Sequence, residues 1–366
     1  MNPVHRFRKV VKSKDRETYA EAALELRHWM MAHDPHFPTY HFTGPESWTN
    51  DPNGPIYYRG RYHLFYQFDP IVEGKRSKRC WGHVVSEDLV HWEDWPVALW
   101  PDSDYDRNGV YSGNTVVDHE GRLCALYTGN VAGRREAYGL VARSTDDGLT
   151  WQKKLVMDNP QRPNTNSPVY WDGFLWREDA TWKQLVGGAT AGEEPQGAAW
   201  LWASDDLEHW TLEANITPDI KLGQHWELPY LIRLGGKALF LVGNGNPYWL
   251  GEYDQEQMRF QPDNLTPFSM DNGNYYSFNA NMTNGRRPNG TERRLMHGWV
   301  TGPPSSAAQV PDWQGAHSIP RVIRVHGDRI WQEPIPEITS LRHAHIHLER
   351  PEPSGRLPIE GDAVEL

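Results

Sequence analysis

Three short segments of the chain resemble one another: SEDLVHW at residues 86–92, STDDGLTW at 144–151 and SDDLEHW at 204–210. Their first serines are 58 and 60 residues apart. A period of this length indicates stacked or radially arranged repeats. Each copy is typical of a Ser-Asp turn followed by a tryptophan at the start of a strand. Such a hairpin joins the two outer strands of a four-stranded propeller blade.

The chain from Tyr40 onward has the pattern of a β protein. Short runs rich in Tyr, Val, Trp, Leu and Phe alternate with clusters of Gly, Pro, Asn and Asp, as in PIYYRGRYHLFYQF and GRLCALYTGN. Five units with the observed period fill residues 40–341. We therefore predict an all-β fold, a five-bladed β-propeller with an N-terminal helix. A two-sheet sandwich is the alternative, but it gives no reason for the repeat.

The N-terminal part differs from the rest. Residues 16–33 contain good helix formers with apolar residues at helical spacing, and Asp34-Pro35 ends the pattern. The basic segment before them is expected to be a solvated tail. The expected organisation is a tail and helix over residues 1–37, the propeller domain over 38–345 and a C-terminal tail over 346–366.

Composition and charge narrow the function. The net charge of -11, without a continuous basic patch, argues against a nucleic-acid or membrane-surface partner. No apolar run is long enough to span a bilayer, and the basic N-terminus lacks the apolar core of a secretory signal, so a cytoplasmic location is expected. The two cysteines are interpreted as free thiols. The 18 Trp, 16 Tyr and 10 Phe suit a carbohydrate site.

If the repeats are blades, residues facing the propeller axis should recur with the same period. Asp51, Ser112, Asp172, Glu227 and Asn279 do so, at intervals of 61, 60, 55 and 52 residues. Three of the five are carboxylates. Taken alone, the two aspartates could be turn residues and the glutamate a buried structural acid. Taken together, converging carboxylates raise one another's pKa, and glycoside hydrolysis needs one ionised nucleophile and one protonated acid.

Other chemistries have weaker support. The sequence lacks the glycine-rich nucleotide-binding motifs, the G-x-S-x-G of serine hydrolases and a C-x-x-C pair. The stretch HAHIH at 343–347 has histidines on one face of a possible strand, which could bind a metal, but it lies outside the repeats. We expect no metal and no cofactor. The expected partner is a small carbohydrate.

Several blocks of the sequence resemble glycoside hydrolase family 32, which includes invertases, inulinases, levanases and fructosyltransferases. HFTGPESWTNDPNGPIYYRGRYHLFYQFDP is similar to the family's opening W-M-N-D-P-N-G block. WGHVVSEDLVHWEDWPVAL, VYSGNTV, LYTGN, DWQGAHSIPRVI and IWQEPIPEITSLR follow in the family's order. The resemblance covers about residues 40–342.

The resemblance implies a retaining hydrolysis of β-fructofuranosidic bonds by double displacement. In it Asp51 corresponds to the nucleophile, Glu227 in HWELPY to the acid/base of the W-E-C-P motif, and Asp172 to the aspartate of the R-D-P motif. Asp179 in WREDATW is a rival for the last role, but aligning the following strand WKQLVGGA favours YWDG. The residues expected to contact the substrate are Asn50, Gln67, Trp81 and Ser112.

Three departures from the family pattern concern the substrate. Trp171 replaces the family's Arg, so an apolar ring stands where a charged donor is expected to hold fructosyl hydroxyls. Leu228 replaces a Cys, and Thr49 replaces a Met. The residues after Leu341 are too few for the family's C-terminal β-sandwich. We expect Trp171 to contact the substrate and sucrose to be a poor one. A fructosyltransferase and a non-catalytic sugar-binding propeller remain the alternatives.

Overall fold

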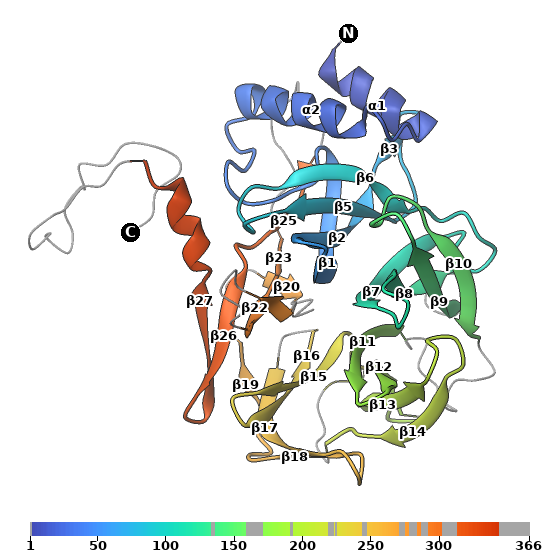
Figure 1. Ribbon diagram of the computed structural model, residues 1–366, viewed down its shortest axis with the longest axis vertical. Helices are drawn as coiled ribbons and strands as arrows, with labels where there is room; N and C mark the ends of the chain where they lie inside the picture. Colours follow the sequence, from blue (N-terminus) through green and yellow to red (C-terminus); the bar gives the residue numbers. More distant parts are fainter. Residues whose placement is uncertain are drawn as a thin grey trace, which may run out of the picture.

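The computed structural model describes residues 2–132, 136–158, 171–190, 193–218, 223, 225–243, 247–270, 275–277, 284–286, 292–301 and 313–343. Successive antiparallel sheets surround a common centre (Figure 1). The predicted five-bladed β-propeller is confirmed. The sandwich alternative is wrong, because consecutive sheets lie side by side around one axis instead of in two stacked layers.

The first four blades share one layout, in which the chain enters on the inner strand and the following strands pair antiparallel outward (Figure 1). They consist of β1 (Ser47–Tyr58), β2 (Arg61–Asp69), β5 (Cys80–Ser86) and β6 (Glu93–Leu99); β7 (Gly109–Val117), β8 (Leu123–Asn130), β9 (Ala137–Ser144) and β10 (Gln152–Met157); β11 (Trp171–Glu178), β12 (Thr181–Ala189), β13 (Gly197–Ser204) and β14 (Thr211–Asn215); and β15 (Pro229–Leu234), β16 (Lys237–Val242), β17 (Pro247–Asp254) and β18 (Arg259–Pro262). The small strands β3 (Ile71–Val72) and β4 (Lys75–Arg76) form a hairpin between β2 and β5, and β19 (Phe268–Ser269) pairs with β17.

The fifth blade is divided into two small sheets. One contains β20 (Tyr275–Ser277), β23 (Trp299–Val300) and β25 (Ala316–His317), and the other contains β21 (Asn284–Arg286), β22 (Glu292–Met296), β26 (Arg321–His326) and β27 (Arg329–Pro334), which is followed by the 3-10 helix η3 (Pro336–Leu341).

The end of the chain closes the ring against its beginning. β24 (Trp313–Gln314) pairs parallel with β1, and the Thr43 hydroxyl donates to the Gly315 carbonyl at 2.7 Å. His317 Nε2 lies 2.6 Å from the carbonyl oxygen of Asn50. These bonds join the last blade directly to the strand segment that carries Asp51.

The three repeated segments form the predicted turns between outer strands β5 and β6, β9 and β10, and β13 and β14. In each turn the serine hydroxyl accepts a hydrogen bond from the backbone N–H of one residue in the turn. The tryptophan indole donates a hydrogen bond to the carbonyl of that same residue. That residue is Leu89, Gly148 or Leu207, with φ of 68°, 93° and 66°. Only local hydrogen bonds are needed to stabilise this left-handed conformation, which explains why the repeat is visible in the sequence.

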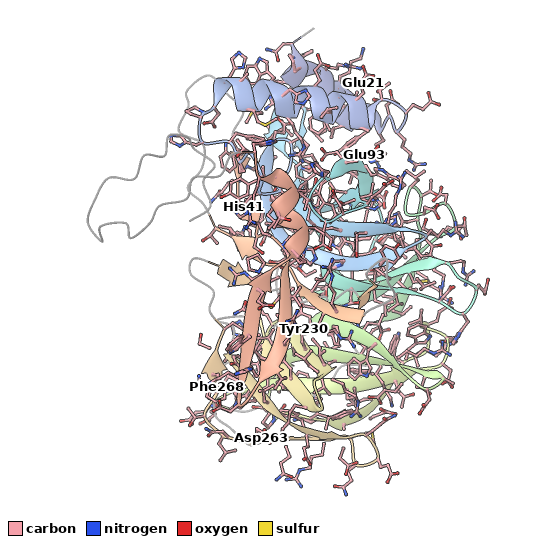
Figure 2. The ribbon with its side chains drawn as sticks, turned by 60° about the vertical axis from the view of Figure 1, so that its left-hand side comes forward. Glu21, His41, Glu93, Tyr230, Asp263 and Phe268 are labelled. Carbon is pink, nitrogen blue, oxygen red and sulfur yellow. The ribbon has the colours of Figure 1, made fainter. Side chains whose placement is uncertain are left out.

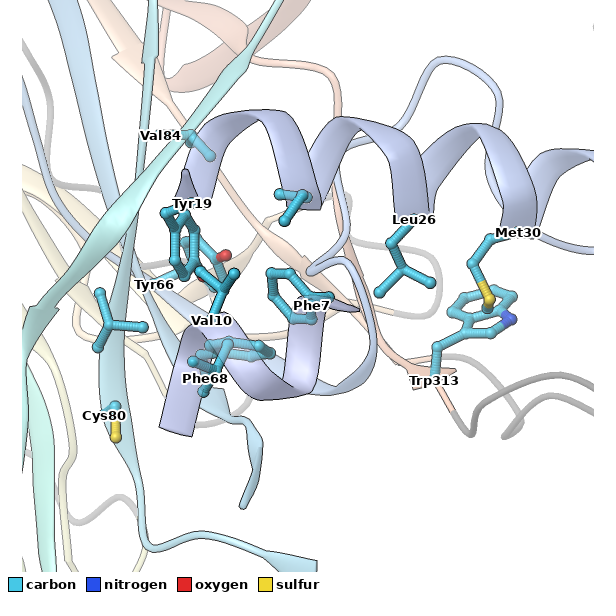
Figure 3. Close-up of a cluster of buried hydrophobic side chains, with 14 of the residues drawn as sticks. Phe7, Val10, Tyr19, Leu26, Met30, Tyr66, Phe68, Cys80, Val84 and Trp313 are labelled. Carbon is cyan, nitrogen blue, oxygen red and sulfur yellow. The ribbon is translucent and has the colours of Figure 1, made fainter. Parts of the chain in front are cut away.

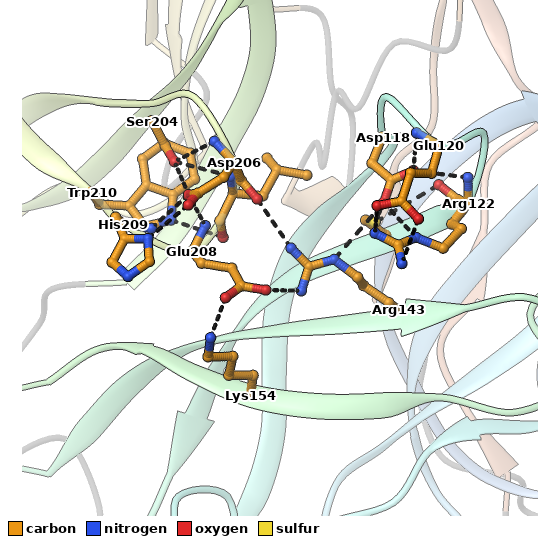
Figure 4. A network of polar contacts seen from close by, with 12 residues as sticks. Asp118, Glu120, Arg122, Arg143, Lys154, Ser204, Asp206, Glu208, His209 and Trp210 are labelled. Carbon is orange, nitrogen blue, oxygen red and sulfur yellow. Dashed lines mark hydrogen bonds and ion pairs between the residues drawn. The ribbon is translucent and has the colours of Figure 1, made fainter.

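Ion pairs hold the turn of the third blade against the second (Figure 4). Arg143 of β9 lies 2.6 Å from Glu208, donates to the Asp206 carbonyl at 3.0 Å, and lies 3.8 Å from Asp118 of its own blade. Lys154 of β10 also binds Glu208. Adjacent blades are therefore joined at the outer edge by a charged network as well as by apolar packing.

Two helices cover the outer strand of the first blade, far from the fourth (Figures 1 and 2). In Figure 2, Glu21 on α2 and Glu93 at the start of β6 lie toward one end of the molecule, and Asp263 lies at the other. The expected helix is α2 (Tyr19–His33), which begins three residues later than predicted.

The expected solvated tail is wrong, because residues 3–13 form a second helix, α1 (Pro3–Ser13). Asn2 caps it by accepting from the Val4 N–H at 2.9 Å. Phe7, Val10 and Val11 are buried against α2 and the first blade (Figure 3). Their i, i+3, i+4 spacing marks one narrow apolar face, which the surrounding basic residues concealed in the sequence.

Three remaining expectations concern the chain as a whole. Cys80 and Cys124 are free and buried. Among the described residues, no helix combines the length and the apolar character needed to cross a membrane. The proposed domain limits of 38 and 345 enclose the strands from β1 to β27, and residues 346–366 lie outside the described part of the chain.

Candidate active site

The predicted channel residues lie at equivalent places in successive blades. Asp51, Ser112 and Asp172 lie near the beginnings of the inner strands β1, β7 and β11, and Glu227 lies two residues before β15. Each of these strands is the first of its blade (Figure 1). The Ser112 hydroxyl contacts Asp51, and the charges of Glu227 and Asp51 act on Asp172, so the four residues lie at the same end of the propeller. Asn279 lies outside the described residues.

A chain of hydrogen bonds leads to the Asp51 carboxylate. Asn50 Nδ2 donates to Gln67 Oε1 at 3.2 Å, Gln67 Nε2 donates to Ser112 Oγ at 2.6 Å, and Ser112 Oγ donates to Asp51 Oδ2 at 2.6 Å. Asn50, Gln67 and Ser112 are almost fully buried. Three residues predicted to contact the substrate thus also hold the predicted nucleophile in one orientation.

Asp51 has an unusual protonation equilibrium for an aspartate. Burial raises its pKa to about 6, and the negative charge of Glu227 acts in the same direction. The Ser112 hydrogen bond and the positive charge of Arg79 oppose this shift. The carboxyl group is therefore mostly ionised at neutral pH, as a nucleophile must be, and becomes protonated in mild acid.

Asp172 occupies a strained position beside this pair. Its φ is 62°, at an irregularity in the pairing of β11 with β12, and its N–H donates to Thr128 Oγ1 at 3.1 Å. Burial, then the charges of Glu227 and Asp51, raise the pKa of Asp172 well above its ordinary value. Its Oδ1 is buried without a hydrogen-bond partner among the described residues. Strained backbone and unsatisfied polar atoms of this kind occur at ligand sites.

Glu227 has 21% of its side chain exposed, and its Oε1 lies 3.3 Å from His225 Nε2. The next residue, Leu228, has φ 49° and is buried in the core. The Gly243 N–H donates to the carbonyls of both Glu227 and Leu228 at 2.9 and 3.1 Å. A strained turn thus separates an accessible acid from its buried neighbour, and the Leu at 228 serves packing.

Two predicted contacts have a different outcome. Trp81 is fully buried between the first two blades, where it packs on Phe65 and Tyr127 and donates to the Tyr111 carbonyl at 2.9 Å. Its predicted contact with the substrate is therefore wrong, because the core covers the ring. Only the backbone of Trp171 is described, opposite Gly187 of β12, so its contact with the substrate stays a prediction.

The rival aspartate lies away from the other carboxylates. Asp179 is exposed in the turn between β11 and β12, with φ 52°, whereas Asp172 is buried beside Asp51 and Glu227. The placement agrees with the alignment of YWDG with the family's R-D-P motif. The role of Asp172 remains a proposal.

Arg79 was missed by the sequence analysis. Its guanidinium lies 4.1 Å from the ring centre of Trp48 and 5.4 Å from that of Tyr111, and its Nε lies 3.4 Å from Asp69 Oδ1. It is close enough to Asp51 to lower the pKa of that carboxyl. The signal was the basic run KRSKR at 75–79, which is usually interpreted as a solvated loop.

The described part of the chain contains no cluster of three or more His, Cys, Asp or Glu residues suited to hold a metal ion. Residues 344–347 of the HAHIH stretch lie outside the described residues.

Comparison with known proteins gives consistent matches. The model of the glycosyl hydrolases family 32 N-terminal domain matches residues 41–334. A sucrose-6-phosphate hydrolase of Bacillus subtilis is 32% identical, over 89% of this chain and 71% of its own length. A Bombyx mori β-fructofuranosidase variant in complex with sucrose is 28% identical, with a TM-score of 0.72 over 90% of this chain and 72% of that one. A Lactobacillus gasseri sucrose-6-phosphate hydrolase is 26% identical, with a TM-score of 0.75 over 94% and 71% of the two chains.

A five-bladed propeller with three interacting carboxylates at the same end of its inner strands is the architecture of a glycosidase, and the matched proteins are hydrolases of fructosides. The chain belongs to glycoside hydrolase family 32. Its activity is hydrolysis of the β-fructofuranosidase type.

Proposed function

We propose that the enzyme cleaves β-fructofuranosidic bonds with retention of configuration, with Asp51 as the nucleophile, Glu227 as the acid/base and Asp172 as the residue that stabilises the transition state. The observation that carries the proposal is the hydrogen bond from Ser112 to Asp51 in a site where all three carboxylates influence one another. Nothing in this chemistry requires a cofactor.

The reaction has two displacements. In the first, an Asp51 carboxylate oxygen forms a bond to the anomeric carbon of the fructosyl unit while Glu227 gives its proton to the departing oxygen. In the second, Glu227 takes a proton from water, whose oxygen replaces Asp51 at the anomeric carbon. The sum is one water consumed per glycosidic bond, and both carboxyl groups return to their starting state.

Asp172 and Arg79 assist this chemistry in different ways. The unpartnered Oδ1 of Asp172 is suited to accept a hydrogen bond from a fructosyl hydroxyl, which strengthens as positive charge develops on the sugar ring. Arg79 favours the ionised form of Asp51. Arg79 also supplies a guanidinium at the site, whereas this chain has Trp171 at the position of the family's Arg.

The substrate is proposed to be a small fructoside. The matched proteins are named for sucrose 6-phosphate and sucrose, so the first assays should compare these two sugars with short inulin and levan oligomers and aryl fructofuranosides. The state of association and the expected lack of nucleic-acid and membrane partners stay predictions. The cytoplasmic location also stays a prediction, which cell fractionation would test.

Retention is tested by trapping the intermediate. Turnover of an aryl β-D-fructofuranoside in buffer containing methanol should give methyl β-D-fructofuranoside as the first methyl glycoside seen by NMR. The α anomer would indicate a single displacement and would rule out Asp51 as a nucleophile. Transfer yields that exceed hydrolysis at low acceptor concentration would favour the fructosyltransferase alternative. Binding of fructosides without turnover would favour the non-catalytic one.

A further inference from the structure

Arg79 lies at the boundary between the first two blades, directly before β5. Its carbonyl accepts the Val110 N–H of β7 at 2.9 Å, and its backbone forms an isolated bridge with Gly109. Its Nε donates to Asp69 Oδ1, at the end of β2, at 3.4 Å. The backbone of Arg79 and the near side of its guanidinium are therefore held by two neighbouring blades.

Two aromatic side chains contact this guanidinium. Its central carbon lies 4.1 Å from the ring centre of Trp48 and 5.4 Å from that of Tyr111. Trp48 lies three residues before Asp51 on β1. Tyr111 lies next to Ser112 on β7, whose hydroxyl donates to the Asp51 carboxylate. The guanidinium is thus held beside the proposed nucleophile, where its charge lowers the pKa of Asp51.

The far side of the guanidinium has donors to offer. Apart from the bond between Nε and Asp69, no hydrogen bond or ion pair joins the Arg79 side chain to the described part of the chain. Nη1 and Nη2 are not among the enclosed side-chain atoms, and 21% of the side chain is exposed. These two nitrogens carry four N–H donors. The donors are therefore accessible to a ligand.

The depth of the neighbouring residues indicates which part of a substrate reaches these donors. The residues that orient Asp51 are almost fully buried, namely Asn50, Gln67 and Ser112. Arg79 and Glu227 are more accessible, each with 21% of the side chain exposed. In the proposed mechanism the fructosyl unit stays on Asp51, and Glu227 protonates the oxygen of the group that departs to solvent. The accessible donors are therefore suited to the leaving group.

The geometry of the donors selects the kind of leaving group. A planar guanidinium presents two N–H groups side by side, which match a pair of neighbouring oxygen atoms. Vicinal hydroxyl groups of a sugar ring supply such a pair, and a phenyl group does not. The contact with the Trp48 ring favours one plane of the guanidinium before a substrate binds. A hydroxylated leaving group should therefore be preferred over an apolar one.

We propose that Arg79 is a specificity-determining residue, whose two Nη groups bind neighbouring hydroxyls of a sugar leaving group. Asp69, Trp48 and Tyr111 hold the guanidinium in position. The proposal rests on the proposed hydrolysis of β-fructofuranosidic bonds. It goes beyond the effect of Arg79 on the charge of Asp51, because that charge acts alike on every fructoside.

Comparison of two substrates tests the proposal. Sucrose has a sugar leaving group with vicinal hydroxyls, and phenyl β-D-fructofuranoside has a leaving group without them. Arg79→Gln should lower the ratio of kcat/KM for sucrose to kcat/KM for the phenyl glycoside by at least about 10-fold, because hydrogen bonds from a charged donor are lost on sucrose alone. Lys75→Gln, at an exposed position of the nearby strand β4, is the matched control and should leave the ratio unchanged.

Arg79→Lys separates hydrogen bonding from charge. The charged groups around Arg79 are Asp69, which Arg76 also influences, and Asp51, on which Glu227 also acts. Lysine keeps the positive charge but cannot form the planar pair of bonds. The acidic limb of kcat/KM should therefore stay in place in Arg79→Lys and move to higher pH in Arg79→Gln. The substrate ratio should fall in both variants.

Binding without turnover tests the same contact independently of hydrolysis. In the Asp51→Asn background, Arg79→Gln should weaken the calorimetric binding of sucrose at least about 10-fold more than the binding of fructose. If Arg79→Gln does not fold, Arg79→Lys takes its place. The proposal is overturned if the substrate ratio is unchanged in both Arg79 variants, or if the binding of sucrose and of fructose weakens equally. If the wild type cleaves neither fructoside, the proposed hydrolysis fails, and the binding comparison decides the role of Arg79.

Discussion

Ser112 on β7 donates a hydrogen bond of 2.6 Å to Asp51 on β1, across the boundary between the first two blades. A hydroxyl has one proton, and Gln67 Nε2 already donates to the same oxygen. The Ser112 proton is therefore directed to the carboxylate. The second blade thus controls the charge of a carboxylate carried by the first.

The acidic limb of the pH–rate profile should report this bond. The hydrogen bond favours the ionised form of Asp51, so Ser112→Ala should raise the pKa of Asp51 above its value of about 6. The acidic limb of kcat/KM should then move to higher pH by about one unit. Ser144→Ala in an outer turn is the control and should leave the limb in place. An unchanged limb in Ser112→Ala would separate Asp51 from the ionisation that governs activity.

Asp51→Asn should lose activity by orders of magnitude and yet gain stability at neutral pH. The folded-state pKa of Asp51 is about 6 and its ordinary value is 3.8, so the wild type loses stability as pH rises from about 4 through 6. An amide escapes this loss, and the variant should be more stable at pH 7 by on the order of 1–3 kcal/mol. Urea unfolding at pH 7 and pH 4 should show the gain only at pH 7. Activity near that of the wild type would remove Asp51 from the chemistry.

Two aspartates on either end of β11 should behave differently. Asp172→Ala should abolish most of the activity, because Asp172 is buried and coupled to Asp51 and Glu227. Asp179→Ala should retain activity, because Asp179 is exposed in the following turn. Steady-state assays of both variants decide the matter. Loss of activity in the second variant alone would mean that the R-D-P motif is aligned incorrectly here.

Trp171→Arg should improve sucrose hydrolysis. Restoring the family's donor should satisfy substrate hydroxyls whose missing hydrogen bonds cost about 1–3 kcal/mol, which corresponds to roughly 5-fold to 150-fold in kcat/KM. Trp331→Arg, at an exposed position on β27, controls for the added charge. Efficient hydrolysis of sucrose by the wild type, without a gain in Trp171→Arg, would contradict the expected altered specificity.

Helix α1 should contribute substantially to stability. The Phe7 ring is fully buried between α1, α2 and the first blade, so Phe7→Ala should lower the free energy of unfolding by about 3–5 kcal/mol. Leu24→Ala on the exposed side of α2 should change it by less than about 0.5 kcal/mol. Denaturant unfolding measures both values. Equal effects would mean that α1 does not pack on the propeller in solution.

The sequence by itself determined the blade pattern and the positions of the carboxylates. Each Ser-Asp turn is stabilised by hydrogen bonds within seven or eight consecutive residues, so its signature stays local and repeats visibly. Once the repeat was recognised, geometry required equivalent positions of successive inner strands to meet near one axis. Asp51, Asp172 and Glu227 could therefore be predicted together, although each alone had an ordinary explanation.

Only the tertiary structure decided which side chains surround those carboxylates. Trp81 and Arg79 are two residues apart in the chain. Trp81 is nevertheless buried and donates to the Tyr111 carbonyl, whereas Arg79 lies over the Tyr111 ring, close enough to Asp51 to lower its pKa. Burial, pKa shifts and ion pairing depend on neighbours brought together from distant parts of the chain, and no local pattern records those distances.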